Sequence, residues 1–306
     1  MGKKKNFHYC LKVFKFIFHT TPNCIAVRKF YFIYCILLVS TAGFSQAVKT
    51  KISAPYIGLG AYSIKHANTF SVTSNQASLA QIKTPSAGVF GENRFLMAET
   101  SMYSAIIAVP TKDGNFAFQA DYFGFKNYNE SQLGIAYARS VGKNFDLGIK
   151  FNYYAFRIPR YENPSTVTFE IGAIAHVTEK LNAGIHIYNP VGGKFSKTEN
   201  DKLGSIYSFG LGYDVSEIFN ISGEIIKEED APVNVNVAMQ YNFARQFFAQ
   251  FGIATQNSSP FGGAGVSWDN FRLDICASYH PQFGISPGLM FIVDIKKQKI
   301  EAEKKL

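Results

Sequence analysis

The sequence lacks the features of a disulfide-stabilised domain and of a protein anchored by long helices. It contains four cysteines in 306 residues, and three of them lie in the first 45 positions (Cys10, Cys24 and Cys35). Once those positions are set aside, the fourth, Cys276, has no partner for an internal disulfide bond. No apolar run approaches the roughly 20 residues that a membrane-spanning helix needs.

Catalytic and cofactor-binding patterns are also missing. Gly58-Leu59-Gly60 lacks the third glycine and the strand-to-helix context of a dinucleotide-binding loop, and a tight turn explains it better. There is no Gly-x-Ser-x-Gly nucleophile elbow, and no pair of histidines or cysteines has the spacing of a zinc site. We therefore predict that the chain is not an enzyme and has no cofactor or metal site.

The chain has little net charge outside its first 45 residues. Its formal net charge is +9, from 31 basic and 22 acidic residues, but seven basic and no acidic residues lie in positions 1–45. The remainder carries 24 basic against 22 acidic residues. Because nucleic-acid binding needs a basic surface, we expect no nucleic-acid partner.

The first 45 residues do contain the pattern of a secretory signal peptide. Arg28 and Lys29 precede an apolar run over 30–39, and small residues follow as far as Ser45. We predict cleavage after Ser45. A membrane anchor is the alternative, but the apolar core has only about 10 to 14 residues where a span needs about 20.

Residues 1–26 form a long basic and aromatic extension that precedes this signal pattern. The chain offers no methionine between Met1 and Met97. We hypothesise that the start is misassigned and that translation begins near Val27 at a non-ATG codon.

Beyond the leader, the sequence alternates between apolar and polar positions. In the range 145–153, bulky apolar side chains occupy every second position, with polar residues or glycine between them. The ranges 233–242 and 271–280 repeat the pattern. A period of two residues is that of a β-strand with one apolar and one polar face.

About fourteen such segments follow one another, separated alternately by short polar turns and by looser connections, of which 156–165 and 189–203 are the longest. An even number of strands places both ends of a barrel on the same side of the membrane. The sequence therefore predicts an all-β fold, a transmembrane antiparallel β-barrel of about 14 strands over 88–295, followed by a charged periplasmic tail at 296–306.

A soluble β-sandwich is the competing architecture, because its strands alternate too. A chain of this length would then be expected to show Greek-key connections and two domains. Aromatic residues make up 15% of the sequence and recur at the predicted strand ends, as the interfacial girdles of membrane barrels do. This pattern favours the membrane barrel.

Residues 46–87 precede the barrel and differ from it, since they are turn-rich and include a short helix-like stretch at 71–80. They are too short to span a bilayer, so we expect a hatch in or under the lumen. Its polar core should hydrogen-bond to inward-facing wall residues, because unpaired buried polar groups are costly. This core comprises Thr73, Ser74, Asn75 and Gln76.

Charged and polar residues on the polar faces of the strands are predicted to line the lumen, where opposite signs can pair at lower cost than in lipid. We interpret them as a network that braces the wall and the hatch, with a permeation path as the alternative. The predicted network consists of Asp121, Lys150, Glu170, His186, Glu224, Arg272 and Asp274.

The fourteen-strand count and two short motifs resemble the FadL-like outer-membrane superfamily. The motifs are Gly-Ala-x-Ser at Gly60–Ser63 and Asn-Gln-Ala-Ser-Leu-Ala at Asn75–Ala80. In the second, Gln76 stands where that family usually has proline, and Ser78 where it has glycine. Within the superfamily the chain is most similar to PorV/PorQ-type proteins of bacteria that use type IX secretion. Further short matches are Glu92–Phe95 with Glu99, and His186–Pro190.

The resemblance implies a protein of the cell outer membrane, in contact with outer-membrane lipid, and two functions. The PorV/PorQ likeness implies a component or accessory of type IX secretion that binds secretion-system components or secreted cargo, and we take this as the main interpretation. The FadL likeness implies the alternative, a hatch-gated channel for a small hydrophobic ligand. Secretion needs exposed outer loops, whereas transport needs an apolar pocket between hatch and wall.

Overall fold

The computed structural model describes residues 56–159, 163–192, 203–229, 231–244, 246–255 and 258–295. The expected signal peptide at 1–45 and the expected tail at 296–306 lie outside the described residues. None of the helices in the described ranges is long and apolar enough to cross a membrane.

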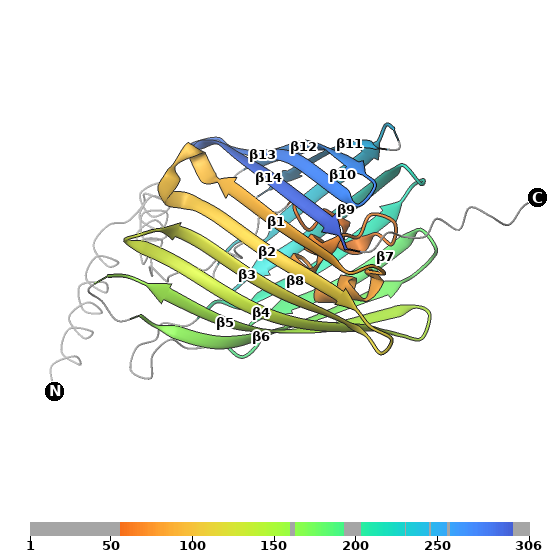
Figure 1. Ribbon diagram of the computed structural model, residues 1–306, viewed down its shortest axis with the longest axis horizontal. Coiled ribbons are helices and arrows are strands. Elements are labelled where there is room, and N and C mark those ends of the chain that lie inside the picture. The colour runs from red at the N-terminus through yellow and green to blue at the C-terminus, as the bar shows by residue number, and fades with distance from the viewer. Residues whose placement is uncertain are drawn as a thin grey trace, which may run out of the picture. The chain divides into compact units, whose positions relative to one another are not determined.

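Fourteen antiparallel strands close into a barrel, as predicted (Figure 1). Each strand pairs with its neighbours in the sequence, and β1 pairs with β14 to complete the circle. The strands are β1 (Ser86–Asn93), β2 (Ser101–Pro110), β3 (Asn115–Phe125), β4 (Tyr128–Val141), β5 (Phe145–Arg157), β6 (Ser165–His176), β7 (Leu181–Tyr188), β8 (Ile206–Asp214), β9 (Phe219–Glu228), β10 (Asn234–Asn242), β11 (Phe247–Ala254), β12 (Ser259–Trp268), β13 (Phe271–His280) and β14 (Gly284–Asp294).

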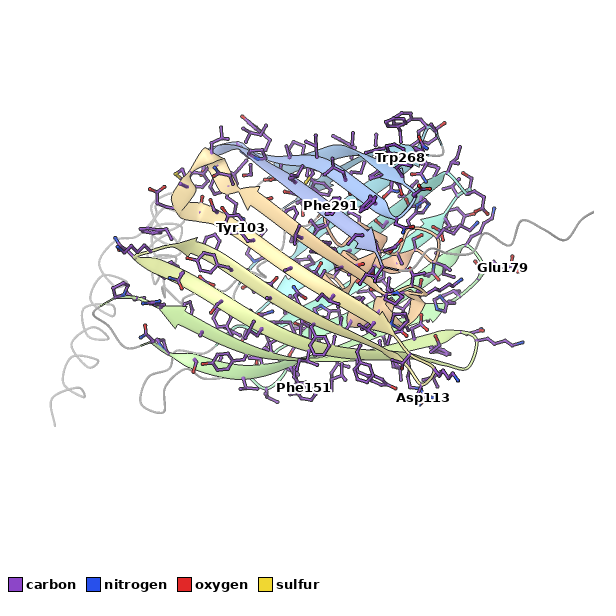
Figure 2. All side chains as sticks on the ribbon, in the orientation of Figure 1. Tyr103, Asp113, Phe151, Glu179, Trp268 and Phe291 are labelled. Atoms are coloured by element: carbon purple, nitrogen blue, oxygen red, sulfur yellow. The ribbon has the colours of Figure 1, made fainter. Side chains whose placement is uncertain are left out.

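The two faces of the wall follow from the alternation in the sequence. On β5, Leu147 and Phe151 are exposed on the outside, whereas Asp146, Lys150 and Asn152 are buried inside. Figure 2 shows apolar side chains such as Phe151 projecting outward from the wall. The outer surface is therefore suited to hydrocarbon, and the polar positions face the lumen.

The two rims of the barrel differ in the lengths of their connections. On the short-turn rim, the six connections 111–114, 142–144, 177–180, 215–218, 243–246 and 269–270 hold two to four residues, and Ser86 pairs there with Asp294. The opposite rim, the long-loop rim, carries the longer connections, including η4 (Arg94–Leu96) and η5 (Ala98–Thr100) between β1 and β2.

One connection on the long-loop rim is shorter than the sequence predicts. Only residues 126–127 join β3 to β4, and Phe125 pairs directly with Tyr128. Gly124 has a φ of 104°, a conformation that residues with a side chain rarely adopt, so the end of β3 bends into the turn.

The N-terminal segment, residues 56–85, precedes β1 and is drawn in orange in Figure 1. It contains three short 3-10 helices, η1 (Leu59–Tyr62), η2 (Thr69–Thr73) and η3 (Gln76–Gln81). The single helix expected at 71–80 is therefore wrong. It is divided at Asn75, whose extended backbone begins η3 and whose side chain accepts a hydrogen bond from the Ala77 amide.

Candidate functional site in the lumen

The N-terminal segment occupies the lumen, and each of its helices lies against a different part of the wall. η2 contacts β1 and β2, η3 contacts β3 to β6, and η1 contacts β7 to β9. Phe70 and Leu79 of the segment are fully buried, as are Met102 and Ile106 of the wall. Burying a side chain of this size contributes about 1.5–3 kcal/mol, so apolar packing holds the segment in place.

Inward-facing glycines of β5 to β8 allow the segment to approach the wall closely. We call Gly148, Gly172, Gly184, Gly210 and Gly212 the glycine groove. A Cβ atom on Gly148 would lie 2.5 Å from the carbonyl carbon of Gln76, and one on Gly184 would lie 2.8 Å from the Tyr62 ring. The wall is thus shaped to receive η1 and η3.

A buried polar network joins η3 to β5, β6 and β7. The Glu170 carboxylate accepts hydrogen bonds from Gln76 and, at 2.7 Å, from Asn152. It also lies 2.9 Å from His186 Nε2 and 3.3 Å from the Lys150 ammonium. A buried ion pair is tolerated when further hydrogen bonds satisfy both charges, and this one has them.

The network continues towards β2 and β3. Lys150 donates to Gln119 Oε1 at 2.9 Å, and Gln119 in turn donates to the Asp121 carboxylate at 2.8 Å. Ser104 donates to the same carboxylate at 2.6 Å. The structure therefore brings together four of the seven residues expected in the lumen network: Asp121, Lys150, Glu170 and His186.

The other three residues of the expected network also face inward, but they contact different partners. Arg272 and Asp274, both on β13, form an ion pair of 2.8 Å, and the Arg272 guanidinium lies 4.2 Å from the centre of the Phe248 ring. Glu224 on β9 accepts a hydrogen bond of 3.1 Å from the Tyr62 hydroxyl. The lumen thus holds several polar clusters rather than one continuous network.

The four residues of the expected hatch core divide into two pairs. Asn75 Nδ2 donates to the Ile185 carbonyl of β7 at 3.0 Å, and Gln76 bonds to Glu170. Thr73 instead donates to the Phe70 carbonyl at 2.7 Å within the segment, because it ends η2. Ser74 lies against Gly58, also within the segment.

Several residues that anchor the segment were not predicted from the sequence, because they stand beside turns. Asp214, the last residue of β8, accepts a 2.5 Å hydrogen bond from Ser63, and Asp146 of β5 accepts one of 3.2 Å from Gln81. Asn115, the first residue of β3, donates to the Leu79 carbonyl at 2.7 Å. Each of these residues occupies an inward-facing position in the alternation of its strand, and this position could have identified it from the sequence.

A second anchor lies towards the long-loop rim. Glu92 and Arg94 belong to one of the short matches named in the sequence, but their contact with Tyr56 was not predicted. Tyr56 donates to the Glu92 carboxylate, which also receives a 2.9 Å bond from Arg94. The Tyr56 ring packs 6.1 Å from that of Phe90 and 5.8 Å from that of Phe261. The segment is thus held at both of its ends.

Burial shifts the pKa of two titratable groups of the segment in the direction that favours their uncharged forms. It raises the pKa of Tyr62 well above the usual 10, an effect that the nearby Glu224 carboxylate reinforces, so the phenol remains a hydrogen-bond donor. Burial also lowers the pKa of His66 from the usual 6.5, against the opposing effect of Asp214. Among the described residues, no three His, Cys, Asp or Glu side chains are placed to hold a metal ion.

A small cavity separates the segment from β9 and β10. Its volume is about 20 Å³, enough for about one water. Gly58, Leu59, Tyr62 and Ser74 line it from the segment, and Ser222, Gly223, Glu224, Asn236 and Ala238 line it from the wall.

Comparison with known proteins establishes the fold. No family model and no curated protein matches the chain. Among solved structures, the CymD monoaromatic hydrocarbon channel is 11% identical with a TM-score of 0.57, covering 74% of this chain and 93% of that one. A FadL homologue of Pseudomonas aeruginosa is 10% identical with a TM-score of 0.56, covering 78% and 98%. The toluene transporter TbuX of Ralstonia pickettii is 8% identical with a TM-score of 0.55, covering 74% and 92%.

The chain therefore has the fold of these FadL-like outer-membrane β-barrels. The FadL-like part of the sequence resemblance is confirmed at this level. The closer likeness to PorV/PorQ-type secretion proteins finds no support in these structures.

Proposed function

We propose that the chain is an outer-membrane channel for small hydrophobic molecules, and that residues 56–85 act as the hatch that closes it. The observation that carries the proposal is the N-terminal segment itself, which lies inside a closed barrel and is fastened to the wall through the glycine groove. A segment that fills a lumen controls passage through it.

The structures that share the fold favour this function over a role in secretion. CymD is described as a monoaromatic hydrocarbon channel and TbuX as a toluene transporter. The described connections of the long-loop rim also include several short ones, such as 126–127 and 281–283, which offer little surface for docking a protein. The channel, which was the alternative interpretation of the sequence, is therefore preferred to the secretion component.

Uptake of a labelled apolar solute tests the proposal. Cells that produce the protein in their outer membrane should take up radiolabelled toluene faster than cells with an empty vector. Uptake of a labelled disaccharide serves as the control for general leakage and should not change. Toluene uptake equal to that of the empty vector, with the protein shown to be assembled by heat-modifiable migration, would contradict the proposal.

Partner capture tests the secretion alternative separately. The tagged full-length protein would be purified from detergent-solubilised outer membrane, and its partners identified by mass spectrometry. Recovery of secretion-system components in stoichiometric amount, together with no toluene uptake, would favour the secretion component over the channel.

A further inference from the structure

Tyr62 is the side chain of the N-terminal segment that fits most closely into the glycine groove. It is almost fully buried, and its ring faces two glycines that pair with each other across β7 and β8, Gly184 and Gly210. A Cβ atom on either glycine would collide with the ring. This part of the wall therefore has no side chains of its own and is filled by the tyrosine.

The position of Tyr62 along the barrel follows from the strand register. Its carbonyl accepts a 3.1 Å hydrogen bond from Asn182, whose register partner Gly212 lies two residues before the end of β8 at the short-turn rim. Its hydroxyl reaches Glu224, the register partner of Gly210 on β9. The side chain thus extends inward from the short-turn rim along β7, β8 and β9.

The same side chain forms one side of the cavity against β9 and β10. Glu224 lines that cavity as well. If the ring moved away, water in the cavity could hydrogen-bond to Glu224 in place of the phenol. Movement of the Tyr62 ring would therefore empty the glycine-lined section of the lumen next to this cavity.

We propose that Tyr62 is the gating residue: its ring closes the path between the cavity and the short-turn rim, and its bond to Glu224 holds the ring in the closed position. This inference rests on the proposed channel function. It assigns the closure to one side chain of the hatch.

Conductance of the full-length protein in planar lipid bilayers tests the inference. Tyr62→Ala removes the ring and should give stable ion conductance where the wild type is nearly closed. Tyr62→Phe keeps the ring but removes the bond to Glu224, and should raise the frequency of brief openings by about fivefold, the effect of losing one hydrogen bond. Tyr154→Ala is the matched control, since Tyr154 is a fully buried tyrosine of β5 that bonds to Glu130 instead.

Conductance of Tyr62→Ala no greater than that of Tyr154→Ala would overturn the inference. If Tyr62→Ala does not assemble, an opening frequency of Tyr62→Phe equal to that of the wild type would overturn it. The toluene assay separates this inference from the function on which it rests. Toluene uptake with a silent Tyr62→Ala contradicts only the gate, whereas conductance of Tyr62→Ala without toluene uptake contradicts only the hydrophobic substrate.

Discussion

At the scale of single residues, Glu170 is the central residue of the polar network that joins η3 to the wall. Its carboxylate is shared by Gln76 of the segment and by Lys150, Asn152 and His186 of the wall. The inward phase of these residues follows from the two-residue period of the strands. Their grouping could not be predicted, because it depends on which strands become neighbours and on where Gln76 enters the lumen.

Removing the Glu170 carboxylate should destabilise the protein strongly. Glu170→Ala leaves the Lys150 ammonium, 3% exposed, without its counter-charge, and breaking a buried pair in this way costs about 3–5 kcal/mol. The midpoint of urea unfolding in lipid vesicles measures the effect. Glu179→Ala is the control, because Glu179 is exposed in the turn after β6 and points away from the barrel in Figure 2. Equal midpoints for the two variants would mean that the pair contributes nothing.

At the scale of elements, the strands were predictable, whereas the helices within the N-terminal segment were not. The range 271–280, read from alternation alone, is also the range of β13. A strand reveals its period because one face meets lipid and the other meets the lumen. The 3-10 helices of the segment have no such period, since wall contacts at Gly148 and Gly184 and the cap at Asn75 shape them.

The close fit between η3 and β5 predicts that a single methyl group should disturb it. Gly148→Ala places a Cβ atom against the backbone of Gln76, and such overpacking costs about 1–3 kcal/mol. The segment should loosen, and trypsin should cut faster at the exposed Lys83 beside it. Gly223→Ala is the control, because the nearest atom to its added Cβ is 3.7 Å away. An unchanged rate of trypsin cleavage in Gly148→Ala would show that the wall shifts to accommodate the added methyl group.

At the scale of the whole molecule, the outer surface is an apolar band and the lumen is densely filled. An inward-facing position does not by itself tolerate a charged substitution. Asn152, for example, is buried and bonded to Glu170, so it has no room for an arginine. Tolerance therefore depends on local packing as well as on which face a residue occupies.

An arginine on the lipid face should impair assembly. Ile275 of β13 is 65% exposed on the outside, and a basic side chain facing hydrocarbon near the bilayer midplane costs about 2–4 kcal/mol. Heat-modifiable migration measures the assembled fraction of Ile275→Arg. Ser278, three residues along the same strand, is inward-facing and only partly buried, so Ser278→Arg should assemble better. Similar assembled fractions would argue against a lipid-facing surface on β13.

The N-terminal segment also constrains the order in which the protein can be built. It is synthesised before every strand, yet its partners are distant in the chain: Tyr62 bonds to Glu224, 162 residues later, and Gln76 to Glu170, 94 residues later. The seam between β1 and β14 joins the two ends of the wall, and a folded segment cannot pass through a finished wall. The segment must therefore be enclosed while the sheet closes around it, or it must enter through an open rim. Because its contacts join residues far apart in the sequence, we expect this to be a slow step of biogenesis.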